Sequence, residues 1–185
     1  MKISKTPILN LLIIQPNVFE DERGYFFESY NKNKFNMEGI NYEFVQDNES
    51  MSKKGVLRGL HFQKPPYAQA KLVRVIKGAA LDVAVDIRKN SATYGQHFTI
   101  ELSEMNKTMM FIPEGFAHGF LTLADNTIFS YKCTQVYNKS SEHTILWNDP
   151  DLNINWGITD PVLSEKDKNA QTFKGFNTLF QYEVQ

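Results

Sequence analysis

The stretch GVLRGLHFQKPPYAQAKLV, residues 55–73, places a histidine and a lysine among small and apolar residues. An imidazole, with an ordinary pKa of about 6.5, can accept a proton near neutral pH, and a lysine ammonium can stabilise a developing negative charge. A histidine between Leu60 and Phe62 is more often a hydrogen-bonded core residue, and a lysine at a strand end is usually solvated. The surroundings of His61 and Lys71 therefore decide between chemistry and structure.

Arg58 lies three residues before His61, so the two side chains would point to opposite faces of an ideal strand. Gly59 permits a bulge that would bring both side chains to one pocket. Lys71 follows the turn KPPYAQA, and a hairpin-like return there would place it near His61. The segment therefore indicates one pocket for a histidine and a lysine, which Arg58 joins if the bulge forms.

Tyr131 and His118 are further candidates. Tyr131 in FSYKC shares a strand face with Phe129 and Cys133, where a tyrosine normally packs with its hydroxyl hydrogen-bonded. Across a cavity from a histidine, its phenol could act as a second proton-transfer group. His118 in PEGFAHGFL is expected in a short loop between strands, where it would cap the turn.

A metal site is not expected. Small β-barrel proteins that hold iron or zinc often use two histidines and a glutamate on one strand, followed by a later histidine. The segment GLHFQKPP supplies one histidine and no carboxylate. We therefore expect chemistry without a catalytic metal.

The elements that would position these residues are mainly strands. Short segments rich in β-branched and aromatic residues are separated by turn residues; they cover residues 71–76, 79–88, 97–102, 108–113, 119–124 and 127–137. Their spacing of roughly ten residues predicts an antiparallel sandwich or barrel. Helices are expected only over residues 30–37 and in LSEKDKNAQTF, where Ser164 is a plausible N-cap.

The segment AALDVAVDIR alternates between two faces. One face carries Leu81, Val83, Val85 and Ile87, and the other carries Asp82, Ala84, Asp86 and Arg88. This pattern predicts one dry and one polar face. The polar face commonly meets solvent, but if it looks into the mouth of a barrel, Asp82 can orient or neutralise a cation there.

The composition limits the class of protein and the kinds of partner. The 185 residues are 42% hydrophobic and 22% charged, which predicts a single domain over residues 1–185. A net charge of −1 with scattered charges argues against a nucleic-acid polymer as partner, and the apolar runs are too short to span a membrane. Leu9–Ile14 lacks the features of a secretory signal and is expected to form a first strand. With Cys133 as the single cysteine, a cytoplasmic location is expected.

Seven segments occur in order along the chain: DERGYFFESY, QDNES, GVLRGLHFQKPPYAQAKLV, DVAVDIRKNSATYG, IPEGFAHGF, YKCTQVYNKSSEHTILWNDP and LSEKD. In order and spacing they resemble the dTDP-4-dehydrorhamnose 3,5-epimerase family, over residues 8–176. The resemblance implies an all-β, cupin-type jelly roll with a few short peripheral helices. It also implies a homodimer that acts without metal or other cofactor on a dTDP-linked 4-keto-6-deoxy sugar.

The resemblance assigns roles to single residues. His61 corresponds to the catalytic base, Tyr131 to the opposing proton donor and Lys71 to the lysine near the keto oxygen of the sugar. Asp167 corresponds to the carboxylate paired with the base, and Asp82 is a second candidate for that role. Asp167 also fits a capping box of the last helix, and the two roles compete for one carboxylate.

Further positions are implied to bind substrate: Arg23, Glu28, Gln46, Asn48, Arg58, His118, Glu142 and Lys166. Arg58, together with Arg23, would hold the diphosphate in charge-assisted hydrogen bonds. The thymine needs an aromatic surface, for which Tyr137 and Phe26 are candidates.

The resulting hypothesis is inversion of C3 and C5 of dTDP-4-dehydro-6-deoxy-D-glucose to give dTDP-4-dehydro-L-rhamnose, a precursor of cell-surface rhamnose. An enzyme that inverts only one of these carbons, or that uses another nucleotide-linked keto sugar, is a close alternative. A non-catalytic sugar-nucleotide-binding cupin and a metal-dependent cupin are more distant ones. Binding alone would not require a base, an acid and an orienting carboxylate together.

Overall fold

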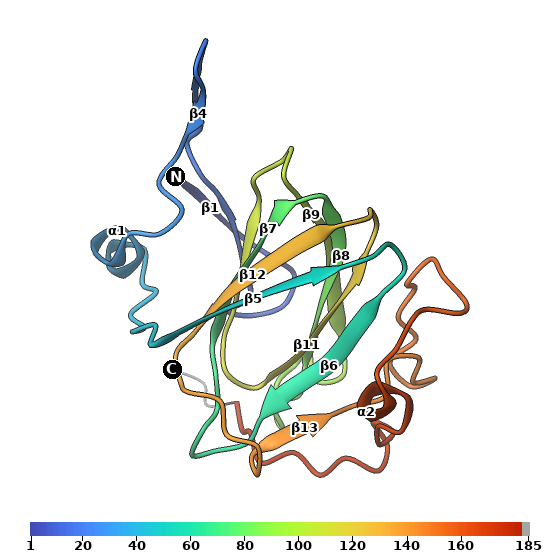
Figure 1. Cartoon of the computed structure of the whole chain (residues 1–185). Helices are drawn as coiled ribbons and strands as arrows, with labels where there is room; N and C mark the ends of the chain where they lie inside the picture. The colour runs from blue at the N-terminus through green and yellow to red at the C-terminus, as the bar shows by residue number, and fades with distance from the viewer. Residues whose placement is uncertain (183–185) are drawn as a thin grey trace.

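The computed structural model describes residues 1–182, which form two packed antiparallel sheets and a small two-stranded arm (Figure 1). The six-stranded sheet contains, in spatial order, β1 (Lys2–Lys5), β2 (Leu12–Gln15), β10 (Met109–Ile112), β7 (Lys71–Lys77), β12 (Thr127–Cys133) and β5 (Gln46–Ser52). The five-stranded sheet contains β13 (Glu142–Thr144), β6 (Leu57–Gln63), β11 (Phe116–Thr122), β8 (Ala79–Asp86) and β9 (His97–Ser103). The arm consists of β3 (Phe19–Asp21) and β4 (Gly24–Phe26). The predicted all-β jelly-roll class is confirmed.

The space between the two sheets is filled by the inward-facing residues of both. Phe120 of β11 and Phe129 of β12 stack with ring centroids 3.9 Å apart and thereby join one sheet to the other. Val73 and Val75 of β7 are buried in the same cluster. Burying each such side chain contributes about 1.5–3 kcal/mol, so this cluster is the main attachment between the sheets.

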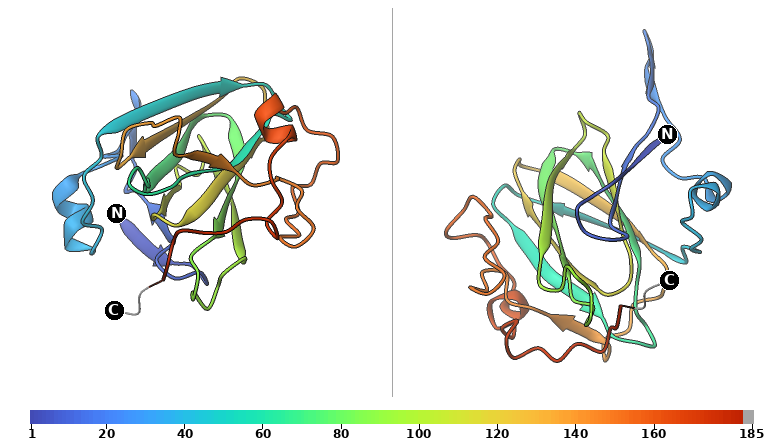
Figure 2. Two further views of the ribbon diagram at one scale, coloured as in Figure 1. Left: turned by 90° about the horizontal axis from the view of Figure 1, so that it is seen from below. Right: turned by 180° about the vertical axis from the view of Figure 1, so that it is seen from behind.

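Both outer faces of the sandwich are also covered. The segment after β13, which includes the short helix α2 (Glu165–Lys168), packs Trp147, Trp156 and Phe176 against the five-stranded sheet. On the other side, α1 (Lys32–Met37) buries Phe35 against the six-stranded sheet. Figures 1 and 2 show these two segments on opposite sides of the sandwich, with the arm projecting away from it.

The structure selects the interior orientation for the polar face of β8 and corrects the expected position of His118. The face of β8 that carries Asp82 and Asp86 is buried inside the sandwich, and both carboxylates are 0% exposed. The opposite face of β8 packs under the C-terminal segment, so neither face meets solvent. His118 lies within β11 and not in a loop, because that strand begins three residues earlier than the apolar run indicated.

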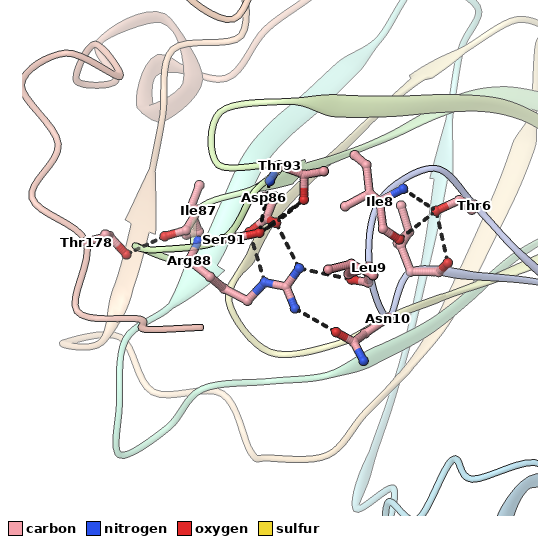
Figure 3. A network of polar contacts seen from close by, with 11 residues as sticks. Thr6, Ile8, Leu9, Asn10, Asp86, Ile87, Arg88, Ser91, Thr93 and Thr178 are labelled. Atoms are coloured by element: carbon pink, nitrogen blue, oxygen red, sulfur yellow. Dashed lines mark hydrogen bonds and ion pairs between the residues drawn. The ribbon is translucent and has the colours of Figure 1, made fainter. Parts of the chain in front are cut away.

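Asp86 forms a polar network between the end of β8 and the N-terminal loop (Figure 3). Its carboxylate accepts hydrogen bonds from Arg88, Ser91 and Thr93 at 2.6–3.0 Å. Arg88 also donates to Asn10 Oδ1 at 3.1 Å. A buried charge is tolerated when it is paired and fully hydrogen-bonded, so this network fastens the N-terminal loop to the sandwich.

Other element boundaries differ from expectation in smaller ways. The last helix is a single turn and does not extend to residue 173. The predicted first strand is shorter than expected, because Asn10 adopts a positive φ of 70° and β2 begins only at Leu12. Strands β1, β3, β4, β5 and β13 were not predicted. Among residues 1–182, no helix is long and apolar enough to cross a membrane.

Candidate active site

A cavity of about 160 Å³ lies between the two sheets, where β5, β7 and β12 of one sheet meet β6 and β13 of the other. Its lining consists of Gln46, Asn48, His61, Phe62, Gln63, Gln69, Lys71, Tyr131, Tyr137 and Glu142. Seven of these ten residues were candidates from the sequence. The structure therefore brings the predicted base, the predicted proton donor and the predicted cation to one place.

The predicted bulge before His61 is present. His61 pairs with His118 and Arg58 pairs with Phe120, so three steps along β6 correspond to two steps along β11. Because cross-strand partners point to the same side, Arg58 and His61 share one face. Gly59 (φ +145°) makes the bulge feasible, since a Cβ there would lie 2.5 Å from Gly119 Cα.

His61 is held by a carboxylate from the C-terminal segment. Its Nε2 lies 2.5 Å from Asp167 Oδ1, and Ser164 Oγ donates to Asp167 Oδ2 at 2.8 Å. Asp167 thus orients the imidazole while its own backbone N–H is capped by Ser164. The contacts with His61 and Ser164 do not compete, because each uses a different carboxylate oxygen.

The environment of this pair sets its proton affinity. Burial lowers the pKa of His61, and the hydrogen bond and charge of Asp167 partly oppose that effect. Burial raises the pKa of Asp167, but its hydrogen bonds from His61 and Ser164 bring it below the ordinary value. With Asp167 ionised, Nε2 of His61 carries the hydrogen and Nδ1 is the basic nitrogen.

Lys71 opens β7 at the base of the cavity and is only 9% exposed. Among residues 1–182, its ammonium has no hydrogen-bond acceptor and no carboxylate within 4.0 Å, and burial lowers its pKa. The connection from β6 is not the expected hairpin, because β6 and β7 belong to different sheets. Lys71 therefore faces His61 across the sandwich. A buried ammonium without a fixed partner is suited to an anion that forms in the cavity.

Tyr131 of β12 lines the same cavity, and burial raises the pKa of its phenol. The phenol therefore stays protonated at neutral pH and is available as a hydrogen donor. It stands on the six-stranded sheet, whereas His61 stands on the five-stranded sheet. The arrangement gives a base and an acid on two facing walls.

The rim of the cavity is a hydrogen-bonded frame. Gln46 Oε1 accepts from the backbone N–H of Tyr137 at 2.8 Å, and Gln46 Nε2 donates to Asn48 Oδ1 at 3.0 Å. Glu142 accepts from the Tyr137 hydroxyl at 3.2 Å and from Lys166 Nζ at 2.8 Å. These five predicted residues therefore belong to one continuous network.

Six predicted substrate-binding residues do not line the cavity: Arg23, Phe26, Glu28, Arg58, His118 and Lys166, of which Lys166 reaches the rim through Glu142. Arg58 donates to Ser52 Oγ, and its charge lowers the pKa of Tyr131 against the larger effect of burial, so it lies beside the cavity. His118 is buried, with Nε2 2.7 Å from Asp82 Oδ1. This contact also answers which carboxylate orients His61, since Asp82 binds another histidine.

The other three residues lie on or just after the arm. The Arg23 side chain is 85% exposed and pairs with Asp21 at 2.6 Å, and Phe26 is 71% exposed. Glu28 pairs with Lys34 at 2.8 Å. The arm projects away from the sandwich (Figure 1), and Arg23 and Phe26 on it are exposed to solvent.

Sequence reasoning did not identify Phe62, Gln63 and Gln69 as cavity residues, and it identified Ser164 only as an N-cap. Gln63 is buried and joins two loops, because Nε2 donates to Tyr67 O and Oε1 accepts from Asn138 N–H, each at 2.7 Å. Its position two residues after His61 in one strand could have identified it. The described residues contain no group of three or more His, Cys, Asp or Glu side chains arranged as metal ligands.

Comparison with known proteins agrees with this geometry. The family model for dTDP-4-dehydrorhamnose 3,5-epimerase matches residues 5–175. The chain belongs to the dTDP-4-dehydrorhamnose 3,5-epimerase family. A family member from Shigella flexneri is 53% identical over 174 residues, which are 94% of this chain and 96% of the relative.

Solved structures of the family share the fold. The dTDP-4-dehydrorhamnose 3,5-epimerase of Elizabethkingia anophelis is 54% identical, with a TM-score of 0.91 over 96% of this chain and 99% of its own. A dTDP-6-deoxy-D-glucose-3,5-epimerase of Legionella pneumophila, solved in complex with dTDP-4-keto-L-rhamnose, is 45% identical, with a TM-score of 0.94 over 99% of each chain. The cupin-type jelly roll implied by the sequence is therefore confirmed.

Proposed function

We propose that the protein inverts C3 and C5 of dTDP-4-dehydro-6-deoxy-D-glucose and releases dTDP-4-dehydro-L-rhamnose. Membership of the epimerase family supports this activity and substrate class. The observation that carries the proposal is the contact between His61 and Asp167 beside a buried Lys71 that has no charged partner among residues 1–182. A site for binding alone would not require a histidine oriented by a carboxylate beside that lysine.

The ketone at C4 acidifies the hydrogens on C3 and C5. His61 removes one of these protons through Nδ1, and the electron pair left on carbon delocalises onto O4 as an enolate. The ammonium of Lys71 stabilises that oxygen, and a preorganised donor of this kind is worth on the order of a hundredfold or more in rate. Asp167 stabilises the imidazolium that forms.

Tyr131 then donates its phenolic proton to the opposite face of the same carbon, which inverts the configuration. Solvent returns a proton to the phenolate and takes one from the imidazolium, so that the site is ready for the second carbon. The stereochemical result depends on the base and the acid standing on different walls, as His61 and Tyr131 do. No electron leaves the substrate in this sequence, and metal independence stays a prediction that exhaustive chelation tests.

The nucleotide is proposed to bind along the rim. Tyr137 is 53% exposed and stands where a thymine ring could stack on it, while Arg58 would bind the diphosphate. Arg23 and Phe26 are proposed to reach the same nucleotide, although the arm holds them away from the cavity of their own chain. This geometry supports a homodimer in which the arm of one copy completes the cavity of the other.

The dimer proposal has a direct test. Mixed dimers of Arg23→Ala and His61→Ala subunits would contain one cavity with His61 intact and an intact arm from the other copy. We expect activity to reappear when the two weakened variants are refolded together. Sedimentation as a monomer at micromolar concentration, or no recovery in the mixture, would contradict the proposal. The cytoplasmic location expected from the sequence stays a prediction.

The activity itself is tested by incubating the protein with dTDP-4-dehydro-6-deoxy-D-glucose in deuterated water and following the sugar by proton NMR. Deuterium at both C3 and C5, with product formed, is the expected result. Exchange at one carbon alone would indicate a single-carbon epimerase, and exchange no faster than without protein would refute the proposed activity on this substrate.

A further inference from the structure

Cys133 is a buried residue that the proposed mechanism does not use. It ends β12, is 0% exposed and does not line the cavity. In the register of the six-stranded sheet it pairs with Lys71 of β7 on one side and with Gln46 of β5 on the other. Directly opposed residues point to the same face of a sheet, with their Cβ atoms about 4.5–5.5 Å apart. The thiol therefore lies beside the stem of Lys71, between two residues that do line the cavity.

A chain of hydrogen bonds reaches the sulfur from β5. The backbone N–H of Tyr137 donates to Gln46 Oε1 at 2.8 Å, and Gln46 Nε2 donates to Asn48 Oδ1 at 3.0 Å. Asn48 Nδ2 in turn donates to Cys133 Sγ at 3.7 Å, where the sulfur is a weak acceptor. Each amide thus accepts on one side and donates on the other. The chain begins at the rim of the cavity and ends on the thiol next to Lys71.

The thiol adjoins Lys71 without neutralising its charge. Burial raises the pKa of Cys133, and the charge of Lys71 and the hydrogen bond from Asn48 only partly oppose that effect. The thiol therefore stays protonated at neutral pH, and no thiolate forms to pair with the ammonium. A carboxylate in the same position would bind the ammonium before the enolate forms. A neutral, weakly polar neighbour leaves the hydrogens of Lys71 for the substrate.

A buried lysine without a charged partner needs another means of holding its position. The long side chain carries about 2 kcal/mol of rotamer entropy, and among residues 1–182 Lys71 has no carboxylate within 4.0 Å. We propose that Cys133 is a positioning residue for Lys71: its sulfur, fixed by Asn48, forms the wall against which the lysine side chain packs. This inference rests on the proposed function.

The pair of variants Cys133→Thr and Cys133→Val tests the sulfur as a hydrogen-bond acceptor. The two new side chains have nearly the same shape and add the same branch to the core, but only the threonine hydroxyl accepts from Asn48. We expect kcat to be about tenfold lower in Cys133→Val than in Cys133→Thr, because small displacements of a catalytic group are costly. KM and the affinity for dTDP should agree within a few-fold, because the enolate forms only after binding.

Thr127→Val is the matched control. Thr127 opens the same strand, is 0% exposed and does not line the cavity. Its hydroxyl donates to Ala124 O at 2.7 Å. The change removes a buried hydroxyl about 20 Å along the strand from Cys133. The free energy of unfolding should therefore fall while kcat stays at the wild-type value.

Equal kcat values in Cys133→Thr and Cys133→Val would overturn the inference. A raised KM with unchanged kcat in Cys133→Val would also overturn it, because the thiol would then serve Asn48 and substrate binding instead of Lys71. If Cys133→Val does not fold, Cys133→Ser and Cys133→Ala make the same comparison with smaller side chains. A wild-type protein without turnover would instead refute the proposed function, and the inference with it.

Discussion

Two buried clusters of charge in this molecule are built in opposite ways. Around Asp86, the carboxylate receives five hydrogen bonds, and the guanidinium of Arg88 lies between the rings of Phe116 and Tyr182, 4.5 and 5.0 Å from their centroids. In the candidate active site, Lys71 is equally buried but has no partner within residues 1–182. Within residues 1–182, the charges of Asp86 and Arg88 are paired with each other, whereas Lys71 has no anionic partner.

The difference indicates which cluster serves stability and which serves chemistry. A satisfied buried ion pair resists change, because removing either partner leaves the other charge uncompensated. A buried cation without a partner destabilises the folded state until a ligand supplies the missing negative charge. Such a residue is expected where binding or catalysis, and not stability, determines which side chain is present. The two clusters should therefore respond in opposite directions to mutation.

The largest effect is expected for His61→Ala. Losing a general base typically costs on the order of 10²–10⁴ in rate, so turnover should fall by that factor. Affinity for dTDP should change only a few-fold, because the nucleotide is proposed to bind at the rim. His143→Ala is the matched control, since His143 lies on the neighbouring strand β13 but does not line the cavity. Turnover near the wild-type rate in His61→Ala would remove the proposed base.

Arg88→Met is expected to affect stability and not chemistry. Leaving Asp86 buried without its partner should lower the free energy of unfolding by about 3–5 kcal/mol, measured by urea denaturation. The kcat of the folded protein should be unchanged. Lys132→Met breaks an exposed pair with Asp47 and should cost at most about 1 kcal/mol. Equal losses of unfolding free energy in Arg88→Met and Lys132→Met would contradict the contrast between the buried, fully hydrogen-bonded pair and the exposed pair.

Lys71→Met should have the opposite pair of effects. Turnover should fall on the order of a hundredfold or more, because the enolate loses its cation. Stability at neutral pH should rise by about 1 kcal/mol, because a buried ammonium without a partner is removed. Since the pKa of Lys71 is lowered in the folded state, the wild-type protein gains stability as pH rises toward the ordinary value of 10.5. The stability gain of Lys71→Met over the wild type should therefore shrink as pH rises. A Lys71→Met variant less stable than the wild type at neutral pH would refute this description of Lys71.

Asp167→Asn is expected to have the smallest effect, about tenfold on turnover, or about 1.4 kcal/mol. The carboxylate raises the pKa of His61 against the larger lowering from burial, so its loss should lower that pKa further. His61 must be neutral to act as base, and the acidic limb of kcat/KM should therefore move to lower pH. Asp151→Asn offers an exposed control in the same C-terminal segment. An acidic limb shifted upward would contradict the contact between Asp167 and His61.

Much of this arrangement could be predicted from the sequence. Short segments rich in β-branched and aromatic residues, bounded by turn residues, located most strands of both sheets. The glycine before Leu60 indicated the bulge that turns Arg58 and His61 to one side. His61, Lys71 and Tyr131 were recognisable because they combine unusual chemistry with strand positions, whereas Gln46, Asn48 and Glu142 were indicated only by the family resemblance. The single domain over residues 1–185 stays a prediction.

The remaining features depend on contacts between distant segments. The burial of both faces of β8 requires the C-terminal segment to cover the sheet, which alternation within one strand cannot reveal. The contact of Asp82 with His118 joins residues 36 positions apart. The separation of the arm from the cavity is likewise a property of the whole fold. Local patterns carry no information about such distances.

The central claim is that His61 and Tyr131 act as base and acid from opposite walls of the cavity. Its most direct test is the Tyr131→Phe variant in deuterated water, followed by proton NMR of the sugar nucleotide. If His61 and Tyr131 act from opposite sides, the variant should still exchange substrate hydrogen for deuterium at the carbon that His61 deprotonates, while inverted product forms at least about a hundredfold more slowly than in the wild type. Inversion at the wild-type rate would contradict the account, as would the loss of exchange together with inversion.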